Sequence, residues 1–153
     1  MFIYMIGIVM LVLIDQLTKF LVDNSMFLGD TIEVISNFFH ITYVQNRGIA
    51  FGVFQGKIDI ISIATVVAII LLLWYFFRNF KTNKTIENIS YLLIISGAIG
   101  NMIDRIFRGY VVDMIDFRGI WSFVFNMADV YINLGVALII LDMFLKKEHK
   151  SSK

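Results

Sequence analysis

The sequence predicts an all-α integral membrane protein, a bundle of four transmembrane helices with a small extracytoplasmic β-hairpin or sheet. Of its 153 residues, 59% are hydrophobic and 16% are charged, and the mean hydropathy is +0.81. Soluble domains contain about 45–50% apolar and about 25% charged residues. At about 1.5 Å per helical residue, four apolar runs are long enough to cross a hydrocarbon core of about 30 Å. These runs cover, approximately, residues 1–22, 58–78, 86–103 and 126–145.

The segments between these runs are too short to form a second large core, so we expect residues 1–153 to form one integral membrane domain. Basic residues gather between the second and third runs and in the C-terminal tail, which predicts that these segments and both termini are cytoplasmic. Segments 23–57 and 104–125, where acids and bases mix, would be extracytoplasmic. The first run lacks the features of a cleaved signal peptide, so we expect a retained span.

Several classes of site are excluded or disfavoured by the residues present. The chain has no cysteine, which excludes disulfides, thiolate metal sites and a cysteine nucleophile. Its two histidines, His40 and His149, are far apart and form no His-Glu-x-x-His motif of zinc metalloproteases. Ser96 lacks the Gly-x-Ser-Gly motif of a rhomboid-type serine site, because Ile94 stands two residues before it. No cationic stripe indicates nucleic-acid binding.

Charged residues interrupt the end of the first run. Asp15 and Lys19 are four positions apart and share one helical face. A carboxylate inside a membrane helix is costly, so it usually faces a bundle interior or a watery cavity and has a partner there. Two interpretations remain open: a simple neutralising pair, or a polar wall near the outer membrane face.

The first extracytoplasmic connection has the composition of a β element. Residues 37–45 are rich in aromatic and β-branched side chains, Asn46-Arg47-Gly48 is a turn signal, and residues 49–54 are again apolar. We therefore expect a short hairpin or small sheet at the membrane interface. Asn46 and Gly48 can serve the turn or contact a ligand, and the isolated His40 indicates an interfacial histidine.

Polar residues also mark the end of the third run. Asn101, Asp104 and Arg105 fall at positions i, i+3 and i+4 and so share one helical face. A solvated helix end would account for Asp104 and Arg105, but not for the deeper Asn101. The preceding small residues would allow another helix to approach closely. They are Gly97, Ala98 and Gly100.

The fourth run begins with Asn126 and Asp129, a pattern typical of an N-cap followed by an acid in the first helical turn. Capping does not explain Asn133, which continues the polar stripe inward.

Three acids lie close together in the sequence between very apolar segments: Asp113, Asp116 and Asp129. Two acids forced together share one proton, so that one can activate water while the other hydrogen-bonds a substrate carbonyl. Spacing alone does not bring Asp113 and Asp129 together.

Five motifs in order resemble those of the bacterial lipoprotein signal peptidases (signal peptidase II). The match extends from the first run to the last and agrees with the chain length and number of spans. Any one motif would be a weak signal, but the ordered set is specific. The motifs are Asp15-Gln-Leu-Thr-Lys19, Asn46-Arg-Gly-Ile-Ala-Phe51, Gly97-Ala-Ile-Gly-Asn-Met-Ile-Asp-Arg105, Val111-Val-Asp-Met-Ile-Asp-Phe117 and Phe125-Asn-Met-Ala-Asp129.

The resemblance implies an aspartic endopeptidase of the bacterial cytoplasmic membrane that needs no cofactor or metal. It would remove signal peptides from diacylglyceryl-modified prolipoproteins, cutting just before the lipidated cysteine. Cyclic peptide antibiotics of the globomycin type would inhibit it. Because each buried CH₂ of an acyl chain contributes about 0.8 kcal/mol, the precursor would stay in the bilayer and arrive laterally at a site near the extracytoplasmic face.

The motifs also imply roles for individual residues. Asp113 and Asp129 match the catalytic pair, with Asp116 as the competing acid. Ile49 and Ser96 depart from the smaller residues usual at their positions, which affects the expected contacts of the hairpin but not the pair. Residues expected to bind substrate or support the site are Asp15, Lys19, Asn46, Gly48, Asn101, Arg105, Asn126 and Ala128, with Ala128 leaving room for the substrate backbone.

A small transporter or channel is the alternative from another class, with Asp15, Lys19, Asn101 and Asp129 lining a polar path. It requires polar residues through the full membrane depth, whereas the sequence concentrates them near one face. A non-catalytic membrane scaffold would leave the ordered acids unexplained.

Overall fold

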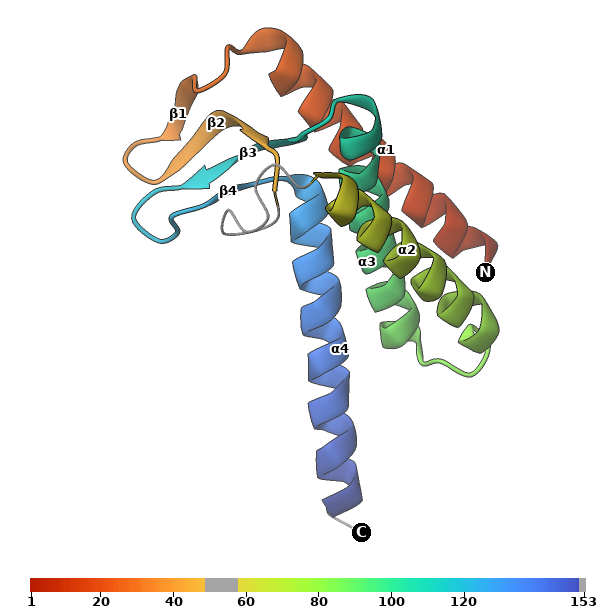
Figure 1. The fold of residues 1–153 in the computed structure, drawn as a ribbon. Coiled ribbons are helices and arrows are strands. Elements are labelled where there is room, and N and C mark those ends of the chain that lie inside the picture. The colour runs from red at the N-terminus through yellow and green to blue at the C-terminus, as the bar shows by residue number, and fades with distance from the viewer. Residues whose placement is uncertain (49–57, 152–153) are drawn as a thin grey trace.

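The computed structural model describes residues 1–48 and 58–151, and within them four long helices and a four-stranded sheet form the fold (Figure 1). All four helices are long and apolar enough to cross a membrane, which confirms the predicted architecture. The third helix continues beyond the expected span, so Asp104 and Arg105 lie inside it. The helices are α1 (Phe2–Ser25), α2 (Ile58–Asn79), α3 (Thr85–Phe107) and α4 (Met127–Ser151).

The sheet joins the two segments that separate α1 from α2 and α3 from α4. Its antiparallel strands follow the order β1-β2-β3-β4, and β2 pairs with β3 so that Asn46 faces Val111 and His40 faces Asp116. Residues far apart in the sequence thus meet beside the helix ends. The strands are β1 (Thr31–Ile35), β2 (Phe39–Asn46), β3 (Val111–Phe117) and β4 (Val124–Phe125).

The hairpin differs from the one expected from the sequence. Its turn lies between β1 and β2, where Asn37 has a φ of 55°, a left-handed conformation that asparagine tolerates better than most residues. Asn46 ends β2, and its Oδ1 accepts a hydrogen bond at 2.9 Å from the Gly48 backbone N–H, so the predicted turn at this point is present. The expected partner strand at 49–54 and the departure at Ile49 lie outside the described residues.

Helix α3 is the centre of the bundle, because α1, α2 and α4 all pack against it. One apolar cluster joins α1, α2 and α3 around Ile8, Phe76 and Ile95. A second joins the end of α1 to the sheet through Val22 and Tyr43, together with Val112 and Met114 of β3.

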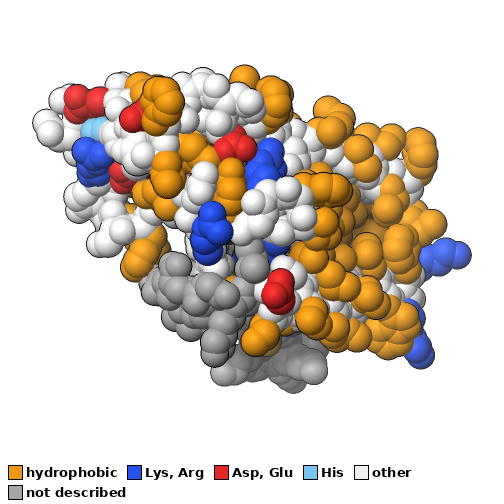
Figure 2. Space-filling model, turned by 45° about the horizontal axis from the view of Figure 1, so that its top comes forward, with side chains coloured by type: hydrophobic (Ala, Val, Ile, Leu, Met, Phe, Trp, Pro, Cys, Tyr) orange, Lys and Arg blue, Asp and Glu red, His pale blue; other side chains and the backbone are white. Residues whose placement is uncertain are grey.

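Large apolar side chains cover most of the outer surface of the helices (Figure 2). Phe2, Ile70 and Met143 are each more than half exposed, as suits side chains that face lipid rather than water. Charged side chains are more frequent toward the sheet in the same view. The N-terminal end of α1 and the C-terminal end of α4 lie away from the sheet (Figure 1). The fold therefore gathers its polar chemistry at one end of an apolar bundle.

Gly97 sets the separation of α3 and α4, because a Cβ added there would overlap the Ala128 backbone carbonyl. We expect Gly97→Ala to destabilise the protein by about 1–3 kcal/mol, since backbone cannot move aside as a side chain can. Thermal unfolding in detergent measures this effect. Gly7→Ala is the matched control, because its Cβ would meet only the flexible end of the Leu92 side chain, at 2.8 Å. Equal melting temperatures for the two variants would contradict this account.

Candidate active site

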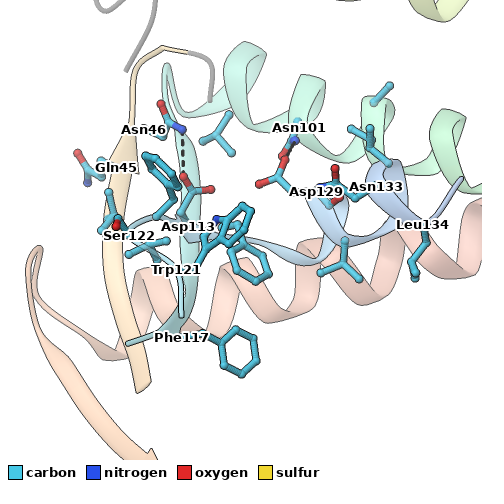
Figure 3. A pocket seen from close by; sticks show the side chains of 18 of the residues that line it. Gln45, Asn46, Asn101, Asp113, Phe117, Trp121, Ser122, Asp129, Asn133 and Leu134 are labelled. Carbon is cyan, nitrogen blue, oxygen red and sulfur yellow. Dashed lines mark hydrogen bonds between the residues drawn. The ribbon is translucent and has the colours of Figure 1, made fainter. Parts of the chain in front are cut away.

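A cavity of about 1120 Å³ lies where the sheet meets α3 and α4 (Figure 3). Its polar wall includes five of the site residues predicted from the sequence: Asn46, Asn101, Arg105, Asp113 and Asp129. The apolar wall includes aromatic side chains from β3, β4 and the segment between them, namely Phe117, Trp121, Phe123 and Phe125. Sequence reasoning did not select these aromatics, although their position between two acidic motifs was a usable signal.

Asp113 enters the cavity from β3 and is only 3% exposed. Its Oδ2 accepts a hydrogen bond from Asn46 Nδ2 at 3.0 Å, and its Oδ1 accepts one from Asn126 Nδ2 at 2.6 Å. Burial and the nearby negative charge of Asp129 raise the pKa of Asp113 to about 7, although the two amide hydrogen bonds act in the opposite direction. This carboxyl group can therefore hold a proton near neutral pH.

Asp129 enters the cavity from the first turn of α4. Asn126 Oδ1 accepts a hydrogen bond at 3.0 Å from the Asp129 backbone N–H, and Asp129 Oδ2 accepts one at 3.2 Å from the Asn126 backbone N–H. This reciprocal arrangement is a capping box, so the predicted N-cap is confirmed. Because Asn126 also donates to Asp113, one residue holds both acids at the cavity.

The Lys19 side chain is completely buried, and three oxygen atoms surround its ammonium group. They are Asp15 Oδ2 at 2.9 Å, Asn101 Oδ1 at 2.9 Å and Asp104 Oδ2 at 3.1 Å. An ammonium group has three donors, so this cage satisfies it fully. Asn101 must turn its oxygen toward Lys19, and its Nδ2 then donates to Asp129 Oδ1 at 2.8 Å. The neutralising pair, one of the two interpretations of the first span, is present, and Asn101 links it to Asp129 at the candidate site.

The two carboxylates bound to Lys19 also hold the backbone next to each acid of the site. Asp15 Oδ1 accepts a hydrogen bond at 2.9 Å from the N–H of Ala128, the residue before Asp129. Asp104 Oδ2 accepts one at 3.0 Å from the N–H of Val112, the residue before Asp113.

A second cation lies on the far side of the Lys19 cage. Arg108 Nη1 lies 2.5 Å from Asp104 Oδ1, and Arg108 Nε lies 3.3 Å from Asp23 Oδ2. Gln16 joins the same network through Asp15, Gly100 and Asp104. Sequence reasoning assigned no role to Arg108, Asp23 or Gln16.

Arg105 brings a positive charge to the cavity wall. Its Nη1 makes a long hydrogen bond of 3.4 Å to the Asn101 backbone oxygen, while its buried Nε has no hydrogen-bond partner among the described residues. The guanidinium is therefore a candidate donor for a bound substrate.

Other sequence-selected residues lie away from the cavity wall. Ala128 is completely buried and faces α3, because a Cβ built on Gly100 would lie 3.3 Å from the Ala128 Cβ. Its small size allows α3 and α4 to pack closely.

Asp116, the competing acid, is bound within the sheet region. Its Oδ2 accepts hydrogen bonds from Thr42 Oγ1 at 2.7 Å and from Arg118 Nε at 3.2 Å. His40 Nε2 lies 3.7 Å from Glu33 Oε1. Among the side chains that the structure describes, no group of three or more His, Asp or Glu could hold a metal ion.

Comparison with known proteins decides the family. Residues 7–145 match the model of a peptidase family described as signal peptidase (SPase) II. The chain belongs to the signal peptidase II family. It is therefore a peptidase, and its four apolar helices embed it in a membrane.

Known relatives and a solved structure are similar to this chain over nearly its whole length. A lipoprotein signal peptidase of Fusobacterium nucleatum is 58% identical over 99% of this chain and 92% of its own length. One of Clostridioides difficile is 42% identical over 96% of this chain and 99% of its own. A solved bacterial membrane enzyme, 34% identical, has a TM-score of 0.92 and covers 100% of this chain and 94% of its own.

Replacement of Lys19 by methionine would leave Asp15 and Asp104 without their shared cation. Removing one partner from a buried ion pair costs about 3–5 kcal/mol, so we expect a large fall in the melting temperature of Lys19→Met in detergent. The double variant Lys19→Met/Asp15→Asn removes one of the uncompensated charges and should recover part of the loss. An unchanged melting temperature in Lys19→Met would contradict a structural role for the cage.

Proposed function

We propose that this chain removes signal peptides from diacylglyceryl-modified prolipoproteins as an aspartic endopeptidase, with Asp113 and Asp129 as its catalytic pair. One observation carries the proposal: two carboxylates from different elements face one cavity and are joined through Asn126. Relatives that match it over nearly the whole chain, and that are named lipoprotein signal peptidases, support the choice of substrate.

The proposed mechanism starts with one proton shared by the acid pair. Asp113, whose pKa is raised to about 7, holds this proton, and ionised Asp129 is the general base. Asp129 removes a proton from water as the water oxygen attacks the scissile carbonyl carbon, while the Asp113 hydroxyl donates a hydrogen bond to the carbonyl oxygen. When the C–N bond breaks, the proton held by Asp129 passes to the leaving amine.

The neighbouring polar groups keep this arrangement in place. Asn101 Nδ2 and the Asn126 backbone N–H donate hydrogen bonds to the Asp129 carboxylate and so hold it in position at the cavity. Arg105 supplies a positive charge to the negative oxygen that develops on the carbonyl, or to the substrate backbone beside it.

The cavity wall also fits a substrate that arrives from the bilayer. It includes Thr65 of α2 and Val130 and Leu134 of α4, which belong to two candidate spans. Helices α2 and α4 each pack on α3. In our proposal the acyl chains stay among lipids while the peptide enters beside α4, and cleavage occurs just before the lipidated cysteine.

We propose that the sheet and the acid pair lie at the extracytoplasmic face and that both termini are cytoplasmic. The basic residues between α2 and α3 and near the C-terminus support this orientation through the positive-inside rule. Membrane lipids would surround the apolar helix surfaces, and cyclic peptides of the globomycin type would compete with substrate for the cavity. The transporter hypothesis is set aside, because the chain belongs to a peptidase family.

Asp113→Asn and Asp129→Asn should each abolish cleavage of a fluorescent lipidated precursor peptide, because neither amide can take part in proton transfer. The assay uses purified protein in lipid or detergent, with the melting temperature as a check on folding. Asp116→Asn is the matched control and should retain activity, since Asp116 bonds Thr42 and Arg118. Full activity in either variant of the pair would refute the assignment.

The pH profile of kcat/KM should fall on its alkaline side. Activity should fall as the pH rises above about 7, because Asp113 then loses its proton. Without this proton it cannot donate a hydrogen bond to the substrate carbonyl. Initial rates at low substrate concentration between about pH 4 and 9 measure the profile. A rate that continues to increase from neutral to alkaline pH is incompatible with a protonated Asp113.

A further inference from the structure

Asn133 is a polar residue of the cavity wall that neither the capping box nor the Lys19 cage uses. It lies on α4, beyond Asp129, inside the candidate span Met127–Lys146 (Figure 3). Its Nδ2 donates a hydrogen bond at 2.9 Å to the Asp129 backbone oxygen, the one hydrogen bond its side chain makes with the described residues. Within the described part of the chain, the amide oxygen and the second N–H of Asn133 therefore have no partner.

The surroundings of Asn133 make this available amide unusual. The same cavity wall includes the apolar side chains of Ala98, Ile132 and Leu134. Further along α4, Val136 and Leu141 are 42% and 48% exposed, as expected for a surface that faces lipid. Polar groups in a membrane helix usually find partners, because hydrocarbon offers none. An exposed amide at this depth indicates a partner that binds there.

A peptide being cleaved inside a membrane protein provides such a partner. The scissile bond must leave helical hydrogen bonding before water can attack it, so the nearby backbone N–H and C=O groups lose their partners. One side-chain amide offers a donor and an acceptor, which match the two groups of a peptide backbone. We propose that Asn133 binds the backbone of the signal peptide next to the scissile bond; this inference rests on the proposed function.

The helix geometry gives the register of this contact. Asn133 follows Asp129 by about one helical turn, about 6 Å along the axis at 1.5 Å per residue. An extended peptide advances about 3.3 Å per residue. With the signal peptide leading into the bilayer, Asn133 contacts the residue about two positions before the scissile bond.

Kinetics of Asn133→Val with a lipidated precursor peptide test the inference. We expect KM to rise about three- to tenfold, the cost of losing one or two hydrogen bonds, with kcat close to wild type because the acid pair is untouched. Asn133→Thr should behave like Asn133→Val, since threonine can retain a bond to the Asp129 carbonyl but has no amide. Val136→Ala, on α4 outside the cavity wall, is the control and should leave KM unchanged.

Substrates with one backbone amide replaced by an ester locate the contact. In wild type, the ester that removes the N–H about two residues before the scissile bond should raise KM by a similar factor. In Asn133→Val the same substitution should have no further effect. A wild-type KM in Asn133→Val or Asn133→Thr overturns the inference. A KM increase that disappears when the acyl esters of the lipid are replaced by ethers also overturns it, because Asn133 would then bind the lipid.

These outcomes are distinguishable from failure of the proposed function. If wild type does not cleave the lipidated peptide, the proposed function fails. If wild type cleaves it, Asp129→Asn does not, and the Asn133 variants match wild type, only the role of Asn133 fails.

Discussion

The buried ammonium group of Lys19 is the interaction on which the site depends. Two of its three partners are carboxylates, and each of these also accepts a backbone N–H from the residue that precedes one acid of the site. Its third partner, Asn101, is thereby oriented to donate to Asp129. A single charge on α1 therefore fixes β3, the start of α4 and one side-chain amide of α3.

The cost of burying this charge explains why the polar network is so extensive. An unpaired ion in a membrane interior is expensive, and a buried pair stabilises the fold only when its remaining donors and acceptors are also satisfied. Arg108 and Gln16 complete the shell around Asp15 and Asp104. The same network separates the structural acids, which are bound to cations, from Asp113, whose side chain is bound by neutral amides. Burial can therefore raise the pKa of Asp113 without a neighbouring cation in direct contact to oppose it.

The site also shows how an apolar bundle can hold a polar cavity. The helices present lipid-facing side chains around most of their surface, while the sheet closes the polar end of α1, α3 and α4. The cavity between them has acids on one wall and aromatic or aliphatic side chains on others. Such a cavity suits a ligand that is part peptide and part hydrocarbon.

The sequence by itself determined the number of helices, the capping of α4 and the identity of the polar residues, because these follow from hydropathy and from spacing within one helix. It predicted that Asp15 and Lys19 share a face, since helical geometry fixes that relation over four residues. It could not reveal that Asp104 completes the cage, that Ala128 packs against α3, or that the hairpin turns at Asn37. The first two depend on contacts of α3 with α1 and with α4, and the third depends on the pairing of β1 with β2. Local periodicity does not encode these contacts. Only the tertiary structure brought Asp113 and Asp129 to one cavity, because strand pairing between β2 and β3 and the charge of Lys19 act between segments distant in the chain.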